Sequence, residues 1–163
     1  MENRVSIERL LGSVEDAMTA PVVTITERTI ASEAARILER SGASGAPVTA
    51  EVGGQVVGVV TLKDLMAKAG VPDALTKGPF HRFEHLLAGI EVDRVMSRDV
   101  VTAQADWPLT RAVEIMRRKG INRLPVVDGS GRLVGILTRD DVLRAVALRS
   151  DTTAGAGSLI EPD

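Results

Sequence analysis

The sequence predicts an α/β (α+β) fold in which two βαββα repeats pack as a pseudo-twofold module. The 163-residue chain aligns with itself at an offset of 78 positions, so that Met18 matches Met96 and Pro47 matches Pro125. Each copy has apolar residues at helical spacing, followed by two β-rich stretches that flank a glycine turn. Because a solenoid usually needs three or more repeats, two long copies favour a paired module instead.

Each copy opens with a β-rich stretch, residues 22–26 in the first and 100–102 in the second. A helix follows, because apolar residues recur at i, i+3, i+4 and i+7 from Ala31 and again from Leu109. Gly42 and Gly120 stand where a left-handed C-terminal cap is expected. These signals mark the ends of both helices.

A β-hairpin is predicted after each of these helices, because two β-rich stretches flank a glycine-containing turn. The four predicted strands are residues 46–50, 55–61, 124–128 and 132–138. A last helix begins directly after Thr61 in the first copy and after Thr138 in the second.

The repeats occupy residues 14–69 and 92–149, and three further segments flank them. These are an N-terminal extension with a short helix (1–13), a linker with a short helix near residues 81–87 (70–91), and a small, polar tail that we expect to be mobile (150–163).

The composition argues against several classes of function. With no cysteine, the chain has no disulfide, thiolate zinc site or thiol nucleophile. A net charge of -2 and only three aromatic residues argue against a nucleic-acid surface. No apolar run approaches the roughly 18 to 20 residues that span a bilayer, and the first residues do not resemble a secretory leader. We therefore expect a soluble, cytoplasmic protein with no nucleic-acid or membrane partner.

The stretches GAPV and RLPV, followed by GVVTLKD and GILTRDD, resemble the repeats of cystathionine β-synthase (CBS) domains, here as a tandem pair. The resemblance covers residues 14–148. It implies that the repeats pair through their sheets and bind an adenosine derivative, such as AMP, ADP, ATP or S-adenosylmethionine, in clefts between them. It also implies a homodimer that regulates a separate, unidentified target protein, with no required cofactor and no catalysis. Ligand binding would act by population shift, changing the surface offered to that target.

A bound adenosine needs a carboxylate for the ribose diol, donors for phosphate and an apolar slot for the base. By this resemblance, Asp64 and Asp141 accept the diol. Thr61 and Thr138 place a hydroxyl at a helix N-terminus, where an anion is favoured. The remaining candidates would line the base slot or reach the phosphate, and they are Val22, Thr24, Val100, Thr102, Gly45, Ala46, Pro47, Asn122, Arg123, Leu124 and Pro125.

The two clefts should differ, because Asn122 and Arg123 of the second copy stand where the first copy has Ser44 and Gly45. An arginine grips a phosphate with two hydrogen bonds, which a glycine cannot do. The alternative interpretation of Arg123 is a solvated strand residue.

Three alternatives to ligand binding follow from the same residues. Thr-x-x-Asp before an apolar run is also a capping box that needs no ligand. As a second hypothesis, the module serves only for dimerisation, with empty clefts. The third is a zinc hydrolase, because His81, Glu84 and His85 form H-x-x-E-H. Since this pattern lies in the linker and lacks an evident third ligand, we expect no metal site.

Overall fold

The computed structural model describes residues 2–71 and 84–155, which form two compact units. The first-repeat unit comprises Val23–Val101 and Ser130–Leu133. The second-repeat unit comprises Met1–Val22, Thr102–Gly129 and Val134–Asp163. The N-terminal extension therefore packs with the second repeat, while the described part of the linker packs with the first.

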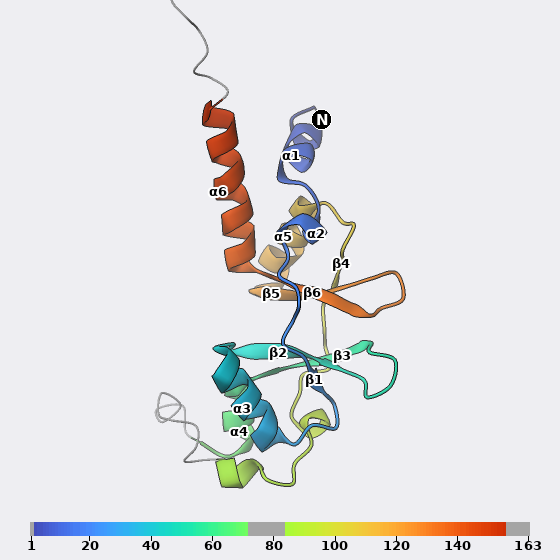
Figure 1. Ribbon diagram of the computed structural model, residues 1–163, viewed down its shortest axis with the longest axis vertical. Coiled ribbons are helices and arrows are strands. Elements are labelled where there is room, and N and C mark those ends of the chain that lie inside the picture. Colours follow the sequence, from blue (N-terminus) through green and yellow to red (C-terminus); the bar gives the residue numbers. More distant parts are fainter. Residues whose placement is uncertain (1, 72–83, 156–163) are drawn as a thin grey trace, which may run out of the picture. The chain divides into compact units, whose positions relative to one another are not determined.

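The first-repeat unit contains a three-stranded sheet in the order β1-β2-β3 (Figure 1). β1 runs parallel to β2, and β2 runs antiparallel to β3 with Pro47 opposite Val59. The elements of this unit are β1 (Ile25–Thr26), α3 (Ala31–Ser41), β2 (Gly45–Thr49), β3 (Val56–Thr61), α4 (Leu62–Lys68) and two 3-10 helices, η3 (Glu84–Leu87) and η4 (Val92–Arg94).

The second-repeat unit contains the matching sheet in the order β4-β5-β6, with β4 parallel to β5. Its elements are α1 (Glu2–Leu11), α2 (Val14–Ala17), β4 (Ala103–Gln104), α5 (Leu109–Lys119), β5 (Arg123–Val127), β6 (Leu133–Thr138) and α6 (Arg139–Gly155). Figure 1 shows α1 and α2 close to α5 and α6, which both short helices contact. The predicted βαββα order is thus present in both repeats.

The opening strand of each repeat is shorter than the sequence predicted, and in the second repeat it also starts later. β1 holds only the last two residues of the predicted stretch 22–26, and β4 begins after the predicted stretch 100–102. A strand needs a partner, and only two residues of each opening stretch pair with the neighbouring strand: Ile25 and Thr26 with β2, and Ala103 and Gln104 with β5. Before β4, the amide of Val100 donates to the carbonyl of Arg98 in a turn instead. The valines of these stretches fit extended backbone but do not guarantee a ladder.

The predicted helix stripe is confirmed as core. Ala31, Ala34, Ala35 and Leu38 of α3 are fully buried. α3 ends at Gly42 in the left-handed conformation, with φ of 69°, and α5 ends in the same way at its own glycine.

Two differences concern the C-terminal tail and the linker. α6 continues to Gly155 and so includes the first six residues of the segment 150–163 that the sequence predicted as a mobile tail. The rest of that segment, residues 156–163, lies outside the described residues, as do residues 72–83 of the linker. The predicted linker helix is therefore described only as η3.

In each unit, one of the repeated methionines packs directly against one of the repeated strand glycines. A Cβ added to Gly58 would lie 2.5 Å from Sδ of Met96 and 2.9 Å from the carbonyl oxygen of Ser97. A Cβ added to Gly135 would lie 2.4 Å from Sδ of Met18. Each glycine therefore lets the first residues of the other repeat lie directly on a strand.

Gly58→Ala is expected to destabilise the protein by about 1 to 3 kcal/mol, because the new methyl group meets a backbone oxygen that cannot rotate away. Gly129→Ala is the control, since a Cβ there meets nothing within 4 Å and the residue lacks a positive φ. Urea unfolding of both variants measures the difference. Equal unfolding free energies for the two variants would show that the contact at Gly58 yields without cost.

Candidate functional site

The threonine and aspartate of the first repeat form a capping box at the start of α4. The amide of Asp64 donates to Oγ1 of Thr61 at 3.1 Å, and the amide of Thr61 donates to Oδ2 of Asp64 at 3.0 Å. The capping that the sequence allowed is therefore present. It uses one carboxylate oxygen, and Oδ1 of the half-buried Asp64 accepts no hydrogen bond from the described residues.

The second repeat builds the same box at the start of α6. The amide of Asp141 donates to Oγ1 of Thr138 at 3.2 Å. In return, Oδ2 of Asp141 accepts from the amide of Thr138 at 2.8 Å and from its hydroxyl at 2.9 Å. Capping thus occupies the same oxygen of the carboxylate in both repeats.

Asp141 has additional partners that sequence reasoning missed. The hydroxyl of Thr19 donates to Oδ1 of Asp141 at 2.9 Å, and Nη1 of Arg144 lies 3.3 Å from the same oxygen. The Asp141 side chain is only 3% exposed. One signal pointed to Thr19: it follows Met18 in the repeat alignment, as Ser97 follows Met96, so a hydroxyl occurs at both places.

The strand before each hairpin lies next to these threonines. In the first-repeat unit, Gly45 pairs with Thr61 and Ala46 with Val60, and every residue of β2 is buried. The carbonyl of Ser44 also accepts from the first amide of α4 at 2.9 Å. The structure therefore places the predicted Gly45–Pro47 lining beside Thr61.

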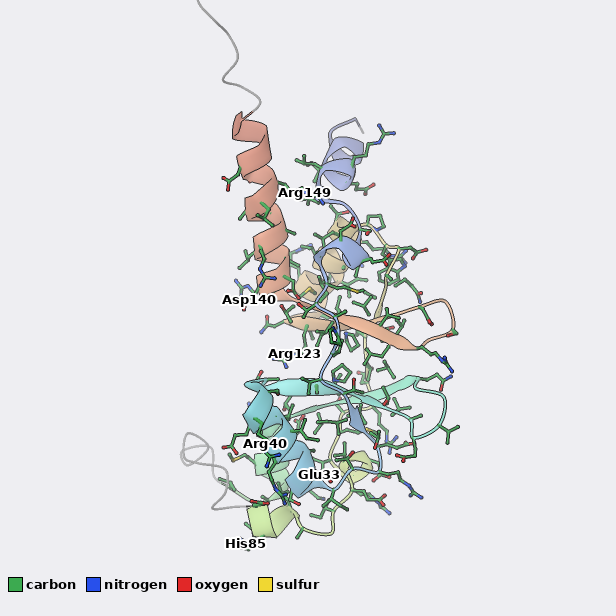
Figure 2. All side chains as sticks on the ribbon, in the orientation of Figure 1. Glu33, Arg40, His85, Arg123, Asp140 and Arg149 are labelled. Carbon is green, nitrogen blue, oxygen red and sulfur yellow. The ribbon has the colours of Figure 1, made fainter. Side chains whose placement is uncertain are left out.

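The second-repeat unit repeats this placement. The carbonyl of Asn122 accepts from the first amide of α6, that of Arg139, at 2.9 Å. Leu124 and Pro125 of β5 are buried, whereas Arg123 is half-buried at the start of that strand, where Figure 2 labels it. The residues predicted around this aspartate thus lie at the same end of the sheet as the start of α6.

The other four predicted lining residues precede the opening strands and are divided between the units. Thr24 and Val100 belong to the first-repeat unit, whereas Val22 and Thr102 belong to the second-repeat unit. Thr24 is exposed, and the other three are half-buried. Their role in ligand binding stays a prediction.

The H-x-x-E-H pattern falls partly outside the described residues, since His81 lies in the undescribed part of the linker. Glu84 pairs with Arg36 of α3, and His85 of η3 is exposed (Figure 2). Across residues 2–71 and 84–155, no group of three or more histidine, aspartate or glutamate side chains is placed to hold a metal ion.

Each site thus combines a carboxylate, a threonine hydroxyl and a buried apolar strand. A carboxylate accepts hydrogen bonds from a diol, and an apolar strand offers surface to a planar base. None of the helices described in the structure is both long and apolar enough to cross a bilayer.

Comparison with known proteins identifies similar chains. The protein MJ1225 of Methanocaldococcus jannaschii is 32% identical over 141 residues, which cover 82% of this chain. The match spans only 47% of that relative, and only about a quarter of each of the next two curated relatives.

Two solved structures share the fold and carry adenosine compounds. The CBS domain pair of protein MJ0100, in complex with 5′-methylthioadenosine and S-adenosyl-L-methionine, is 30% identical with a TM-score of 0.65. It covers 85% of this chain and 98% of its own. CBSX2 in complex with AMP is 27% identical with a TM-score of 0.68, and it covers 85% of this chain and 98% of its own.

The family model of the CBS domain matches this chain twice, at residues 14–70 and 92–148, which together make up well over half of it. These two matches coincide with the two βαββα repeats and with the two Thr-x-x-Asp boxes. The chain belongs to the CBS domain family and contains a tandem pair of these domains.

Proposed function

We propose that this protein is a regulatory module that binds an adenine nucleotide and modulates a separate partner protein in the cytoplasm, without catalysing a reaction itself. The observation that carries the proposal is the duplicated Thr-x-x-Asp box. In the first repeat, only one carboxylate oxygen of Asp64 takes part in the helix cap. Solved CBS pairs with the same fold in complex with AMP, and with 5′-methylthioadenosine and S-adenosyl-L-methionine, support the class of ligand.

In this proposal the ribose diol donates to the aspartate, and the base lies against the apolar strand before the hairpin. A carboxylate suits this role, because hydrogen bonds to a charged acceptor are stronger than neutral ones. Arg123 supplies a cation for the phosphate in one of the two sites, as its guanidinium is suited to bidentate contacts.

The alternative is a module that dimerises and never binds a nucleotide, with the capping boxes serving only the helices. The two hypotheses differ in one measurable property. A ligand that binds the native state must raise the melting temperature, and a capping box without a ligand site gives no such rise.

Thermal unfolding with AMP, ADP, ATP and S-adenosylmethionine at millimolar concentration tests the proposal. At 100 times its dissociation constant, a ligand stabilises the native state by about 2.7 kcal/mol, which shifts the midpoint by several degrees. GTP serves as the control for nonspecific phosphate binding. An unchanged midpoint with every adenine compound would favour the ligand-free module.

We also propose that the protein is a homodimer joined through a groove between α5 and α6 of the second-repeat unit. This groove is a cavity of about 420 Å³ in which Val113, Met116, Ile121, Val142 and Leu143 provide the apolar lining. Leu143 is 58% exposed, although it is a large apolar side chain.

The first repeat shows how such a face is normally covered. Leu38, Leu65 and Met66 are the counterparts of Met116, Val142 and Leu143, and all three are buried. They share one core with Val71 and with Leu87 of η3, so the linker of the chain itself covers this face. Among the described residues, nothing covers the second-repeat groove in the same way.

A second copy of the chain fits this groove, because a twofold contact is self-complementary. The groove offers both a cavity and the protruding Leu143 to fill the cavity of the partner. The charged residues of its lining are Arg117 and Arg139, and the latter precedes Asp140, which is labelled at the start of α6 in Figure 2. In this dimer, ligand binding changes the surface offered to the target protein by favouring one conformation.

A further inference from the structure

The two aspartates of the proposed sites differ in their surroundings. Both oxygens of Asp141 are occupied by the protein itself: Oδ2 by the amide and hydroxyl of Thr138, and Oδ1 by the hydroxyl of Thr19 and by Nη1 of Arg144. The side chain of Asp141 is 3% exposed. This carboxylate therefore has no oxygen without a partner.

The first repeat lacks the corresponding hydroxyl contact. Ser97 is the counterpart of Thr19, and the backbone of each makes the same bridge to a strand, Ser97 to Val59 and Thr19 to Ile136. Within the described residues, however, the exposed Ser97 donates no side-chain hydrogen bond to Asp64. The repeats thus share a backbone contact, but only one of them adds a side-chain donor.

We infer that Thr19 lowers the affinity of the second site, because its hydroxyl competes with the ribose diol for Asp141. The Asp64 site is then the tighter of the two. The inference rests on the proposed function. A diol approaching Asp64 finds Oδ1 available, whereas one approaching Asp141 must first displace the Thr19 hydroxyl. Exchanging one hydroxyl donor for another at the same oxygen removes most of the gain from that bond.

The magnitude follows from the strength of the displaced bond. A hydrogen bond to a charged acceptor changes affinity by roughly tenfold or more. Removal of the Thr19 hydroxyl should therefore raise the affinity of the Asp141 site for AMP roughly tenfold. The remaining Arg144 contact is longer, at 3.3 Å, and its side chain is 65% exposed, so it yields more readily.

Calorimetric titration of AMP into Thr19→Val tests the inference, in the Asp64→Asn background so that only the Asp141 site is left. Valine keeps the shape of threonine and removes its hydroxyl. The backbone bridge between Thr19 and Ile136 does not involve the side chain, so the fold is retained; far-ultraviolet circular dichroism verifies this, and Thr19→Ala serves as a second variant. Thr19→Ser, which keeps the hydroxyl, and Ser97→Ala, at the matching position of the other repeat, are the controls.

The expected result is AMP affinity roughly tenfold higher in Thr19→Val and Thr19→Ala than in the Asp64→Asn parent, with both controls unchanged. Unchanged or weaker AMP binding in both hydroxyl-free variants overturns the role of Thr19, while the proposed function stands as long as the natural sequence binds AMP. If the natural sequence binds none of AMP, ADP, ATP and S-adenosylmethionine, both are overturned.

Discussion

Asp64→Asn is expected to weaken AMP binding roughly tenfold to a hundredfold, because losing a charge-assisted hydrogen bond costs about 1.5 to 3 kcal/mol. The substitution preserves the size of the side chain and one acceptor oxygen. That oxygen can still accept from the amide of Thr61, which is the capping contact of the natural carboxylate. Stability should therefore change by less than the roughly 1 kcal/mol that loss of a cap costs.

Calorimetry for affinity and urea unfolding for stability separate these two quantities. Asp140→Asn is the matched control, since it removes one exposed carboxylate from the first turn of α6 without touching either capping box. If Asp64→Asn loses stability by the amount of a missing cap and binds AMP as tightly as the control, Asp64 serves only the helix.

Leu143→Asp is expected to weaken the proposed homodimer at least thirtyfold, because a charge placed in the centre of an apolar contact costs 2 kcal/mol or more, as truncation of an interface hot spot does. Sedimentation velocity at micromolar concentration should shift from dimer to monomer. Leu148→Asp is the matched control: it lies on the same helix and is 63% exposed, but it does not line the groove.

The control should remain dimeric and as stable as the natural sequence. A natural sequence that sediments as a 17.3 kDa monomer would contradict the homodimer itself. A Leu143→Asp variant that stays as dimeric as Leu148→Asp would place the interface elsewhere on the protein.

Periodicity and turn chemistry were sufficient to predict most of the fold. Apolar spacing located α3 and α5, and their C-terminal glycines have the expected left-handed conformation. The hairpin strands lie within one residue of their predicted bounds, since each ends at a glycine turn or at a capping threonine. These signals are local, and local patterns can be read from a single chain.

The short opening strands were predicted less well, because their extent depends on a partner that is distant in the sequence. Residues 100–102 have the valines of a strand, yet the ladder begins only at Ala103, where Val126 is opposite. A β-branched stretch predicts extended backbone, and pairing decides which part becomes a strand.

The sequence predicted the contacts of the site between residues close in the chain but not those between residues far apart. The capping boxes follow from a spacing of three residues and were foreseen as an alternative to ligand binding. The contact between Thr19 and Asp141 spans 122 positions, and only the fold reveals it. The sequence predicted that the two sites differ at Arg123 and Gly45. The structure adds a difference at the aspartates, because both oxygens of Asp141 have partners, whereas Oδ1 of Asp64 accepts no hydrogen bond from the described residues.

In the proposed function, the two aspartates bind the ribose of an adenine nucleotide. Calorimetric titration of AMP into the natural sequence and into the Asp64→Asn, Asp141→Asn double variant tests it most directly. We predict a measurable binding event for the natural sequence and none at the same concentrations for the double variant, with both proteins folded. A double variant that binds AMP as tightly as the natural sequence would contradict the assignment of both sites.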